Sequence, residues 1–564
     1  MPAELQVGLD RLLRDPSALR GKRLGLLANP ASVTSGFVPA WRALPAAGLN
    51  LVRLFGPEHG FTGAAQDMEA VGSGGPPCLP IVSLYGTTFE DLTPRPDQLD
   101  GLDAVVCDLP DVGSRYYTFV WSIALMMKAC AQRGLPVTVL DRPNPLGGVT
   151  MEGNLPEEPL LSFVGLYPVP VRHAMTPAEI AVHVNETFGL GCELHVVPLR
   201  KRSGVPSRAE LGEPAAWVLP SPNMPTPDTA LVYPGMCLVE GTNLSEGRGT
   251  TRPFELVGAP WLGSESAADI ANALALPGVV FRPHSFKPTF QKHAGKLCGG
   301  VQLHVTDPAA FRSYETGLRL IKAFRDMAPS EFRWRTEVYE YRDDVPAIDL
   351  LAGTATYRQL VDGGEWLDGW IRTFDADLAR FGAQRERHLL YPDRPAGPPA
   401  ILVVGAHEAG KTTLAASLVA ALTARGYRVG SVKHTDHEYD TDLAGKDSHR
   451  HAAAGANPAV LVAGRRAARH SVEEAPRVLE GFLARELAGA DVAVVEGYKR
   501  AALPKIEVVR GAVERAPVAA EDPHLLAVVT DTETPHPAEV PRFRFDELER
   551  LLGLVVRTLG LEPK

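Results

Sequence analysis

The most specific chemical pattern in the sequence is the stretch Gly405-Ala-His-Glu-Ala-Gly-Lys-Thr-Thr413. It matches G-x-x-x-x-G-K-[ST], a phosphate-binding loop whose glycines let backbone N–H groups surround phosphate oxygens. In such a loop Lys411 reaches the β- and γ-phosphates and Thr412 binds Mg²⁺. The predicted nucleotide-binding residues are Gly405, His407, Glu408, Ala409, Gly410, Lys411, Thr412 and Thr413.

A carboxylate suited to the same magnesium ion ends the apolar run Asp491-Val-Ala-Val-Val-Glu496. In phosphate-loop proteins an acidic residue on a neighbouring strand holds the ion together with the loop threonine. We therefore expect Thr412 and Glu496 to bind the metal; the alternative is a strand-end carboxylate that faces solvent. Nearby histidines match no zinc spacing, which favours phosphate or partner contacts over a metal. They are His434, His437, His449 and His451.

Charged residues also gather in the first 150 residues, directly after three short apolar runs. The loops are Gly56–Phe61, Asp108–Tyr117 and Asp141–Gly148. Because ligands of an open parallel sheet bind in the crevice outside the carboxyl ends of its strands, these loops are expected to converge on one site. That site would carry Glu58, His59, Asp108, Asp111, Arg115, Asp141 and Asn144.

A third polar stretch is Val239-Glu-Gly-Thr-Asn-Leu-Ser-Glu-Gly-Arg-Gly-Thr-Thr-Arg-Pro-Phe254. Its plain interpretation is a solvated loop. Its glutamates, asparagine and arginines, combined with flexible glycines, favour a sugar or anion site instead. The residues of interest are Glu240, Asn243, Glu246 and Arg248.

Paired carboxylates indicate glycoside hydrolysis, which needs one general acid and one base, nucleophile or charge stabiliser. Glu58 is the candidate acid, because Pro57 and His59 on either side can hold it rigidly at a strand end. Asp141, Glu240 and Glu246 remain open as its partner. For each carboxylate the alternative is a surface or structural role, and a lone histidine such as His59 is more often structural.

The elements that must position these residues alternate between strands and helices. Apolar runs at 22–28, 50–55, 80–84, 103–108 and 136–141 predict strands, with an amphipathic helix over 118–133. This alternation predicts an α/β fold with a Rossmann-like parallel sheet. No glycine-rich dinucleotide motif follows any of these strands, so the fold does not imply NAD.

The remaining chain predicts three further parts. Residues 1–150 form the predicted Rossmann-like catalytic domain. Residues 151–390 mix helix and strand patterns, which predicts a second, smaller α+β domain. The stretch 391–399 is proline-rich and predicts a linker, because prolines interrupt helices and central strands. Residues 400–564 form the predicted phosphate-loop NTPase domain, with further strands at 428–433, 491–496 and 525–530.

The totals restrict the class of partner. The chain has 564 residues and a net charge of -10, which argues against a general nucleic-acid or anionic-membrane binder. Six cysteines without a C-x-x-C pair argue against a disulfide framework or a thiolate zinc site. No signal peptide or run of membrane-spanning length is visible, so the expectation is a cytoplasmic protein without nucleic-acid or membrane partners.

The first part of the chain resembles the exo-acting β-N-acetylmuramidase family, long treated as a domain of unknown function. The resemblance covers about residues 3–392. It is carried by Gly56-Pro-Glu-His-Gly-Phe61, by Asp108-Leu-Pro-Asp-Val-Gly-Ser-Arg-Tyr-Tyr-Thr118, by Asp141-Arg-Pro-Asn-Pro-Leu-Gly-Gly148 and by Glu240-Gly-Thr-Asn-Leu-Ser-Glu-Gly-Arg-Gly-Thr250.

This resemblance implies a cleft between a Rossmann-like domain and a smaller domain, where N-acetylmuramic acid is removed from the non-reducing end of peptidoglycan fragments. It implies Glu58 as the main catalytic carboxylate. Arginines such as Arg115 or Arg248 would hold the lactyl carboxylate in bidentate fashion. Without an export signal, the expected substrate is an imported muropeptide sugar; the alternative is that this domain has another substrate.

The last part, about residues 399–560, is similar to the molybdopterin-guanine dinucleotide biosynthesis protein B family. The phosphate loop carries this resemblance together with Lys433–Asp440, Gly445–Ala456, Glu496-Gly-Tyr-Lys499 and Pro504-Lys-Ile-Glu507. It implies a GTP-binding protein, often dimeric, that assists the guanylyltransferase of the molybdenum cofactor. Because no Asn-Lys-x-Asp motif is present, Asp531 is the candidate for reading guanine.

The sequence therefore predicts a muramidase-like glycoside hydrolase fused to a GTP-binding adapter with weak or no GTPase activity. A homodimer is a further expectation. The alternative keeps the nucleotide module and treats the first part as a non-catalytic sugar-binding or docking scaffold. A third interpretation is a gene fusion with two independent activities.

Overall fold

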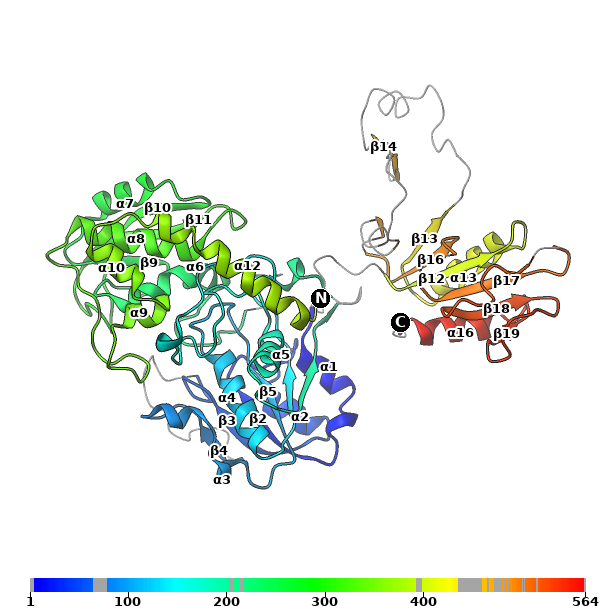
Figure 1. Cartoon of the computed structure of the whole chain (residues 1–564), viewed down its shortest axis with the longest axis horizontal. Helices are drawn as coiled ribbons and strands as arrows, with labels where there is room; N and C mark the ends of the chain where they lie inside the picture. Colours follow the sequence, from blue (N-terminus) through cyan, green and yellow to red (C-terminus); the bar gives the residue numbers. More distant parts are fainter. Residues whose placement is uncertain are drawn as a thin grey trace. The chain divides into compact units, whose positions relative to one another are not determined.

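The computed structural model describes residues 5–63, 79–201, 206–212, 217–391, 398–434, 459–463, 466–470, 479, 483, 486–487, 489–499, 501, 503–513 and 516–561. The chain divides into two compact units, which are considered separately below (Figure 1). The first unit contains Met1–Lys201 and Pro206–Asp393, and the second contains Arg394–Lys564 with Arg202–Val205.

The first unit is built on a six-stranded parallel sheet with the order β4-β3-β2-β5-β6-β7. This order reverses direction between β2 and β5, as in doubly wound folds. The predicted α/β class with a Rossmann-like sheet is confirmed. The strands are β2 (Arg23–Ala28), β3 (Asn50–Gly56), β4 (Ile81–Ser83), β5 (Ala104–Asp108), β6 (Val137–Leu140) and β7 (Leu194–Val197).

Alternate residues of these strands face two different hydrophobic clusters, because successive side chains of a strand point to opposite faces. Val105 and Cys107 pack in the cluster that includes Met126 of α4, whereas Val106 packs with Leu9 of α1. The buried strands therefore read as continuous apolar runs. The helices here are α1 (Gly8–Arg14), α2 (Ala40–Ala46), α3 (Pro96–Leu99), α4 (Phe119–Gln132) and α5 (Pro177–Thr187).

The helix expected over 118–133 corresponds to α4, and the structure buries it on nearly every side. Within Phe119–Gln132 the exposed residues are Lys128 and the last residue, Gln132. One flank of α4 packs on the sheet, and Trp121 and Leu125 on another flank contact a separate apolar cluster. The helix is therefore a central element of the core, buried more completely than the amphipathic helix that the sequence predicted.

The rest of the first unit contains a three-stranded antiparallel sheet in the order β10-β11-β9 and a group of helices. A single hydrophobic cluster extends from Leu27 of the parallel sheet to Phe374 of α12. These elements are β9 (Leu256–Ala259), β10 (Val279–Phe286), β11 (Cys298–Val305), α6 (Pro227–Met236), α7 (Ser264–Ala273), α8 (Ser313–Met327), α9 (Ala347–Ala352), α10 (Thr356–Asp362), α11 (Asp368–Ile371) and α12 (Phe374–Arg385), with a short pair of β1 (Leu5–Gln6) and β8 (Arg200–Lys201).

The second unit contains a six-stranded, wholly parallel sheet in the order β13-β16-β12-β17-β18-β19. Ile401 and Val403 of β12 pack with α13 and α16, and Leu402 and Val404 pack on the other face with Leu479. Its elements are β12 (Ala400–Gly405), α13 (Lys411–Ala424), β13 (Val429–Lys433), the antiparallel pair β14 (Ala459–Ala463) and β15 (Arg466–His470), β16 (Val492–Glu496), β17 (Lys505–Val509), β18 (Leu525–Thr530), β19 (Arg542–Phe543) and α16 (Leu548–Thr558).

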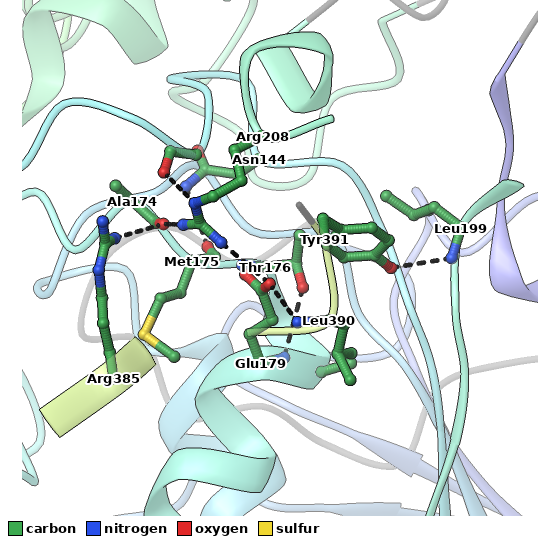
Figure 2. Close-up of polar contacts among 12 residues, drawn as sticks. Asn144, Ala174, Met175, Thr176, Glu179, Leu199, Arg208, Arg385, Leu390 and Tyr391 are labelled. Atoms are coloured by element: carbon green, nitrogen blue, oxygen red, sulfur yellow. Dashed lines mark hydrogen bonds and ion pairs between the residues drawn. The ribbon is translucent and has the colours of Figure 1, made fainter. Parts of the chain in front are cut away.

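A buried polar network fastens the last residues of the first unit to its parallel sheet (Figure 2). Glu179 on α5 accepts hydrogen bonds from the Leu390 backbone N–H at 2.8 Å and from Arg208 at 3.1 Å. Arg385 donates to the Ala174 carbonyl at 2.8 Å. The hydroxyl of Tyr391 accepts from the Leu199 N–H at 2.9 Å. The chain therefore remains within the folded unit through Tyr391, which the composition had placed in the linker.

Asp141, at the end of β6, occupies the centre of this network. Its carboxylate accepts hydrogen bonds from the Thr176 hydroxyl at 2.9 Å, the Ala178 N–H at 3.0 Å and the Tyr391 hydroxyl. Burial raises the pKa of Asp141 to about 7, although these hydrogen bonds act in the opposite direction. A carboxyl with a raised pKa in the folded state contributes stability below its unfolded pKa, and this contribution is lost as pH rises through the folded pKa.

We predict that Asp141→Asn removes this pH dependence from the first unit. The pKa of this carboxyl is ordinarily 3.8 and is about 7 in the folded protein. The difference in melting temperature, wild type minus Asp141→Asn, should therefore fall as pH rises from 3.8 to 7. Thermal unfolding of both proteins over this range measures the difference, with exposed Asp97→Asn as the control. A difference that stays constant with pH would contradict the prediction.

Among the described residues, no helix combines the length and the apolar character that crossing a bilayer requires.

Candidate functional site

Glu58 lies in a tight turn directly after β3. A side chain at Gly56 would approach the backbone nitrogen of Phe61 to 2.6 Å, so the turn requires glycine there. His59 has a positive φ of 65°, which reverses the chain immediately after Glu58. Glu58 is 6% exposed, and its Oε2 accepts a hydrogen bond of 2.6 Å from the Thr118 hydroxyl at the start of α4. The carboxylate is therefore held in one orientation.

Glu58 lines an open pocket, whose volume of about 520 Å³ includes open solvent. Aromatic rings form much of its wall: Tyr233 stands edge-on to Tyr117 at 5.9 Å and to Phe254 at 4.9 Å between ring centroids. Polar side chains converge on the pocket among these rings, and convergent polar groups of this kind fix the orientation of a bound small molecule. The lining residues are Glu58, His59, Tyr116, Tyr117, Thr118, Phe119, Val164, Ser221, Asn223, Met224, Tyr233, Glu240, Arg248, Phe254, Tyr339 and Glu340.

Glu240 and Arg248 reach this pocket as parts of one buried ion pair. Glu240 accepts from Arg248 Nη2 at 2.5 Å and from the Tyr339 hydroxyl at 2.8 Å. Both of its carboxylate oxygens are therefore engaged within the protein. The Arg248 guanidinium also lies over the Phe254 ring, 5.2 Å from its centroid.

Glu246 lies behind the pocket wall rather than in it. Its carboxylate accepts from Lys292 Nζ at 3.0 Å and lies 3.5 Å from Arg248 Nε. Burial alone would raise the pKa of Glu246, but the charges of Lys292 and Arg248 outweigh burial and lower it. Glu246 therefore stays ionised and fixes the orientation of Arg248.

Three charged residues from the first half occupy structural positions outside the pocket lining. Asp108 forms a bidentate pair with Arg142 at 2.6 and 2.7 Å. Arg115 is fully buried and donates to the carbonyls of Asn154, Val169 and Leu351 at 2.7 to 3.0 Å. Asp141 belongs to the network described above. The structure places these three side chains outside the lining of the Glu58 pocket, and each is engaged inside the protein.

The predicted asparagines and Asp111 also make internal contacts outside the lining. Asn144 donates to the Met175 carbonyl at 3.0 Å (Figure 2), and Asn243 bridges the backbones of Glu331 and Arg333 at 2.8 and 2.9 Å. Asp111 accepts from the Gly113 N–H at 2.7 Å and lies 3.4 Å from His173 Nε2.

Sequence reasoning missed most of the residues that form the pocket. Tyr116 and Tyr117 are buried lining residues, and the Tyr116 hydroxyl has no hydrogen-bond partner among the described residues. They lie in the loop after β5 that the sequence had selected for its charged residues. Glu340 lies in the pocket although no motif or strand end marked it. No signal in the sequence would have found Glu340.

In the second unit the phosphate loop connects β12 to α13. Positive φ angles of 143° at Gly405 and 97° at Gly410 require glycine at both positions, and Glu408 also has a positive φ of 66°. A side chain at Gly405 would approach the Val508 carbonyl oxygen, which confirms the tight fit. Lys411 Nζ donates to the Ala406 carbonyl at 2.6 Å, so the ammonium lies across the loop. Partial burial lowers the pKa of Lys411.

Thr412 and Glu496 meet beside this loop. The Thr412 hydroxyl donates to Glu496 Oε1 at 2.9 Å, and Lys433 Nζ lies 3.5 Å from the same oxygen. A hydroxyl and a carboxylate are oxygen ligands of the kind that Mg²⁺ prefers, so this pair fits such an ion. No group of three or more His, Cys, Asp or Glu suited to a metal occurs in the described part of the chain.

The other predicted nucleotide residues have separate positions. His407 and Glu408 are exposed on the loop, where Ala409 is buried beneath it. Thr413 is exposed on the first turn of α13. Asp531 follows β18, is exposed, and accepts from the Gly511 N–H at 2.8 Å. His434 packs against the Tyr498 ring at 4.4 Å, whereas His437, His449 and His451 lie outside the described residues.

Comparisons with known proteins also divide the chain between residues 391 and 400, where the two compact units meet along the sequence. Residues 24–228 and 231–391 match the family models described as "Exo-beta-N-acetylmuramidase NamZ", N-terminal and C-terminal. Residues 400–531 match the model described as "Molybdopterin guanine dinucleotide synthesis protein B".

Individual relatives agree with these models. The chain is 41% identical over 392 residues to the peptidoglycan β-N-acetylmuramidase NamZ of Bacillus subtilis, covering 69% of this chain and 92% of the relative. It is 36% identical over 151 residues to the molybdopterin-guanine dinucleotide biosynthesis adapter protein of Escherichia coli, covering 26% of this chain and 85% of the relative.

A solved structure supports the fold of the first unit. A DUF1343 family protein from Bacteroides fragilis matches with a TM-score of 0.60 and 30% identity, covering 69% of this chain and 99% of that protein. The chain therefore belongs to the exo-β-N-acetylmuramidase family over residues 24–391 and to the molybdopterin guanine dinucleotide synthesis protein B family over residues 400–531.

Proposed function

We propose that the first unit hydrolyses the glycosidic bond of a terminal, β-linked N-acetylmuramic acid in peptidoglycan fragments, with Glu58 as its general acid. The observation that carries this proposal is the buried Glu58 carboxylate, held by Thr118 at 2.6 Å in an aromatic-lined pocket. Membership of the muramidase family and the name of the Bacillus subtilis relative support the choice of sugar. Glu58 gives its proton to the glycosidic oxygen as the bond to the anomeric carbon breaks, and water supplies the hydroxyl of the released sugar.

We assign the lactyl carboxylate of the substrate to Arg248. It is the arginine in the pocket lining, and guanidinium groups bind carboxylates well. Glu240, Glu246 and Tyr339 fix its position from behind through the contacts described above. Glu240 and Glu246 thus serve the site by orienting Arg248. His59 shapes the turn that presents Glu58, since its positive φ reverses the chain there.

We further propose that the second unit binds GTP with Mg²⁺ and presents it to the guanylyltransferase of the molybdenum cofactor. The loop glycines, Lys411 and the Thr412–Glu496 pair support the phosphate and metal part of this assignment. When bound, Mg²⁺ would neutralise phosphate charge at Thr412 and Glu496. Guanine selection is assigned to Asp531, and a homodimer is proposed on the family resemblance. The two units act as separate modules in one cytoplasmic protein.

We predict that Glu58→Gln abolishes most hydrolysis of a muramic-acid-terminated disaccharide. Loss of the general acid should lower kcat/KM by roughly 10²- to 10⁴-fold. The rate is measured by release of reducing sugar, and exposed Glu90→Gln is the matched control. Unchanged hydrolysis by Glu58→Gln would remove Glu58 from the mechanism, whereas binding without hydrolysis by the wild type would favour the scaffold alternative.

Lys411→Ala is expected to weaken GTP binding by the full chain. A charged hydrogen bond contributes about 1.5–3 kcal/mol, so the Kd should rise roughly ten- to a hundredfold. Isothermal titration measures this change. Arg425→Ala, at the opposite end of the same helix and paired with Glu549, is the control. Equal GTP affinity of Lys411→Ala and the wild type would reject the phosphate-loop assignment.

Glu496→Gln should raise the magnesium concentration that GTP binding requires. Because the change removes one negative charge beside Thr412, the Mg²⁺ concentration needed for half-maximal GTP binding should rise at least severalfold. Glu549→Gln, at an exposed position, should leave that concentration unaltered. If Glu496→Gln binds GTP with the same magnesium requirement, Glu496 does not serve the metal.

A further inference from the structure

A two-residue turn brings a second carboxyl group into the pocket of Glu58. Tyr339 and Arg342 exchange both backbone hydrogen bonds, at 2.9 and 3.0 Å, so Glu340 and Tyr341 form the tip of the turn. Both tip residues have positive φ, 46° and 65°. This is the geometry of a type I′ turn, which is normally occupied by asparagine or glycine.

Glutamate and tyrosine are unfavourable in this conformation, because their Cβ atoms crowd the backbone when φ is positive. Such strain persists only where the surroundings fix it, and it concentrates at functional sites. Relaxing the turn would swing Glu340 away from its present position. The strained backbone therefore serves to direct this side chain.

Contacts on both sides hold the turn in place. On one side the Tyr339 hydroxyl donates to Glu240 at 2.8 Å. On the other side the Tyr341 ring meets Tyr85 edge-on at 5.8 Å and Phe89 at 6.3 Å between centroids. These aromatic contacts belong to the segment just after β4, so the turn is anchored to the Rossmann-like sheet.

Glu340 is 4% exposed and lines the same pocket as Glu58. After burial, the charge of Glu340 and then that of Glu58 raise the pKa of Tyr341. Both carboxylates therefore lie within electrostatic reach of one phenol. Glu240, the remaining carboxylate of the lining, has Arg248 and Tyr339 on its two oxygens. The pocket lining thus includes acidic side chains from separate elements, among them Glu58 on the turn after β3 and Glu340 on the 339–342 turn.

We propose that Glu340 is the second carboxylate of the reaction, in place of the Asp141, Glu240 and Glu246 candidates. The proposal rests on the hydrolase function proposed above and deepens it. As water adds to the anomeric carbon, Glu340 takes the proton that the water releases, while Glu58 gives its own proton to the departing oxygen. One C–O bond forms, one breaks, and the two carboxyls exchange protonation states, which solvent then resets.

The test compares two substrates in the full-length protein. One is the natural disaccharide; the other is a nitrophenyl glycoside of N-acetylmuramic acid, whose leaving group needs no proton. Glu340→Gln is expected to lower kcat/KM by roughly 10²- to 10⁴-fold on both substrates, because water activation is needed in each case. Glu58→Gln should lose rate on the disaccharide but much less on the nitrophenyl glycoside. Exposed Glu337→Gln, on the same segment, is the matched control.

Chemical rescue separates a base from a structural residue. Azide is an anionic nucleophile that needs no base, so added azide should restore cleavage of the nitrophenyl glycoside by Glu340→Ala. Azide then takes the place of water at the anomeric carbon, and nitrophenolate and a glycosyl azide are the products. If that variant does not fold, Glu340→Gly, which removes the strain at positive φ, carries the same test.

Three outcomes decide the proposal. An equal fall in kcat/KM of Glu340→Gln on both substrates, with azide rescue of the alanine or glycine variant, supports the proposal. Rates of Glu340→Gln within a few fold of the wild type, or loss without any azide rescue, overturn it. If Glu58→Gln and Glu340→Gln both keep full activity on the disaccharide, the proposed assignment of Glu58 fails as well, which is a distinct result.

Discussion

Parallel strand pairing is the constraint on which both sites depend. Every strand of the two six-stranded sheets runs in the same direction as its neighbours, so all carboxyl ends of a sheet meet at one edge. Glu58 follows β3 and Thr118 comes after β5 at such an edge, and the hydrogen bond between them joins two strands through their loops. The phosphate loop after β12 and Glu496 at the end of β16 use the same arrangement. Two unrelated chemistries therefore depend on one backbone geometry.

That constraint brings many polar residues to one edge, and their partners determine which of them face the pocket. Arg142 neutralises Asp108, and backbone carbonyls surround the Arg115 guanidinium. A buried charge without such partners is costly, so these side chains stabilise the scaffold. Glu58 differs, because its partner is a neutral hydroxyl rather than a cation. The distinction between scaffold and site is a matter of what each carboxylate contacts.

The sequence predicted the strands, the phosphate loop and the position of Glu58 just after a strand, since these depend on local patterns of apolar runs and glycine spacing. It failed where distant segments decide the outcome. Tyr391 reaches Asp141 from 250 positions away along the chain, and no local pattern reveals that contact. Glu340 escaped notice for a different reason, because its turn lacks the asparagine or glycine that marks such turns.

The contact between Tyr391 and Asp141 also sets where the chain can be cut. Tyr391 is 3% exposed and bonded to both Asp141 and the Leu199 backbone, so the folded unit extends to the end of the muramidase-family match. A fragment that stopped at the end of α12 would expose the Glu179 and Asp141 carboxylates and lose the strap formed by residues 388–391. The first unit therefore needs its chain through Tyr391 to keep these contacts. A protease that separates the two units without disturbing the first must cut after Tyr391.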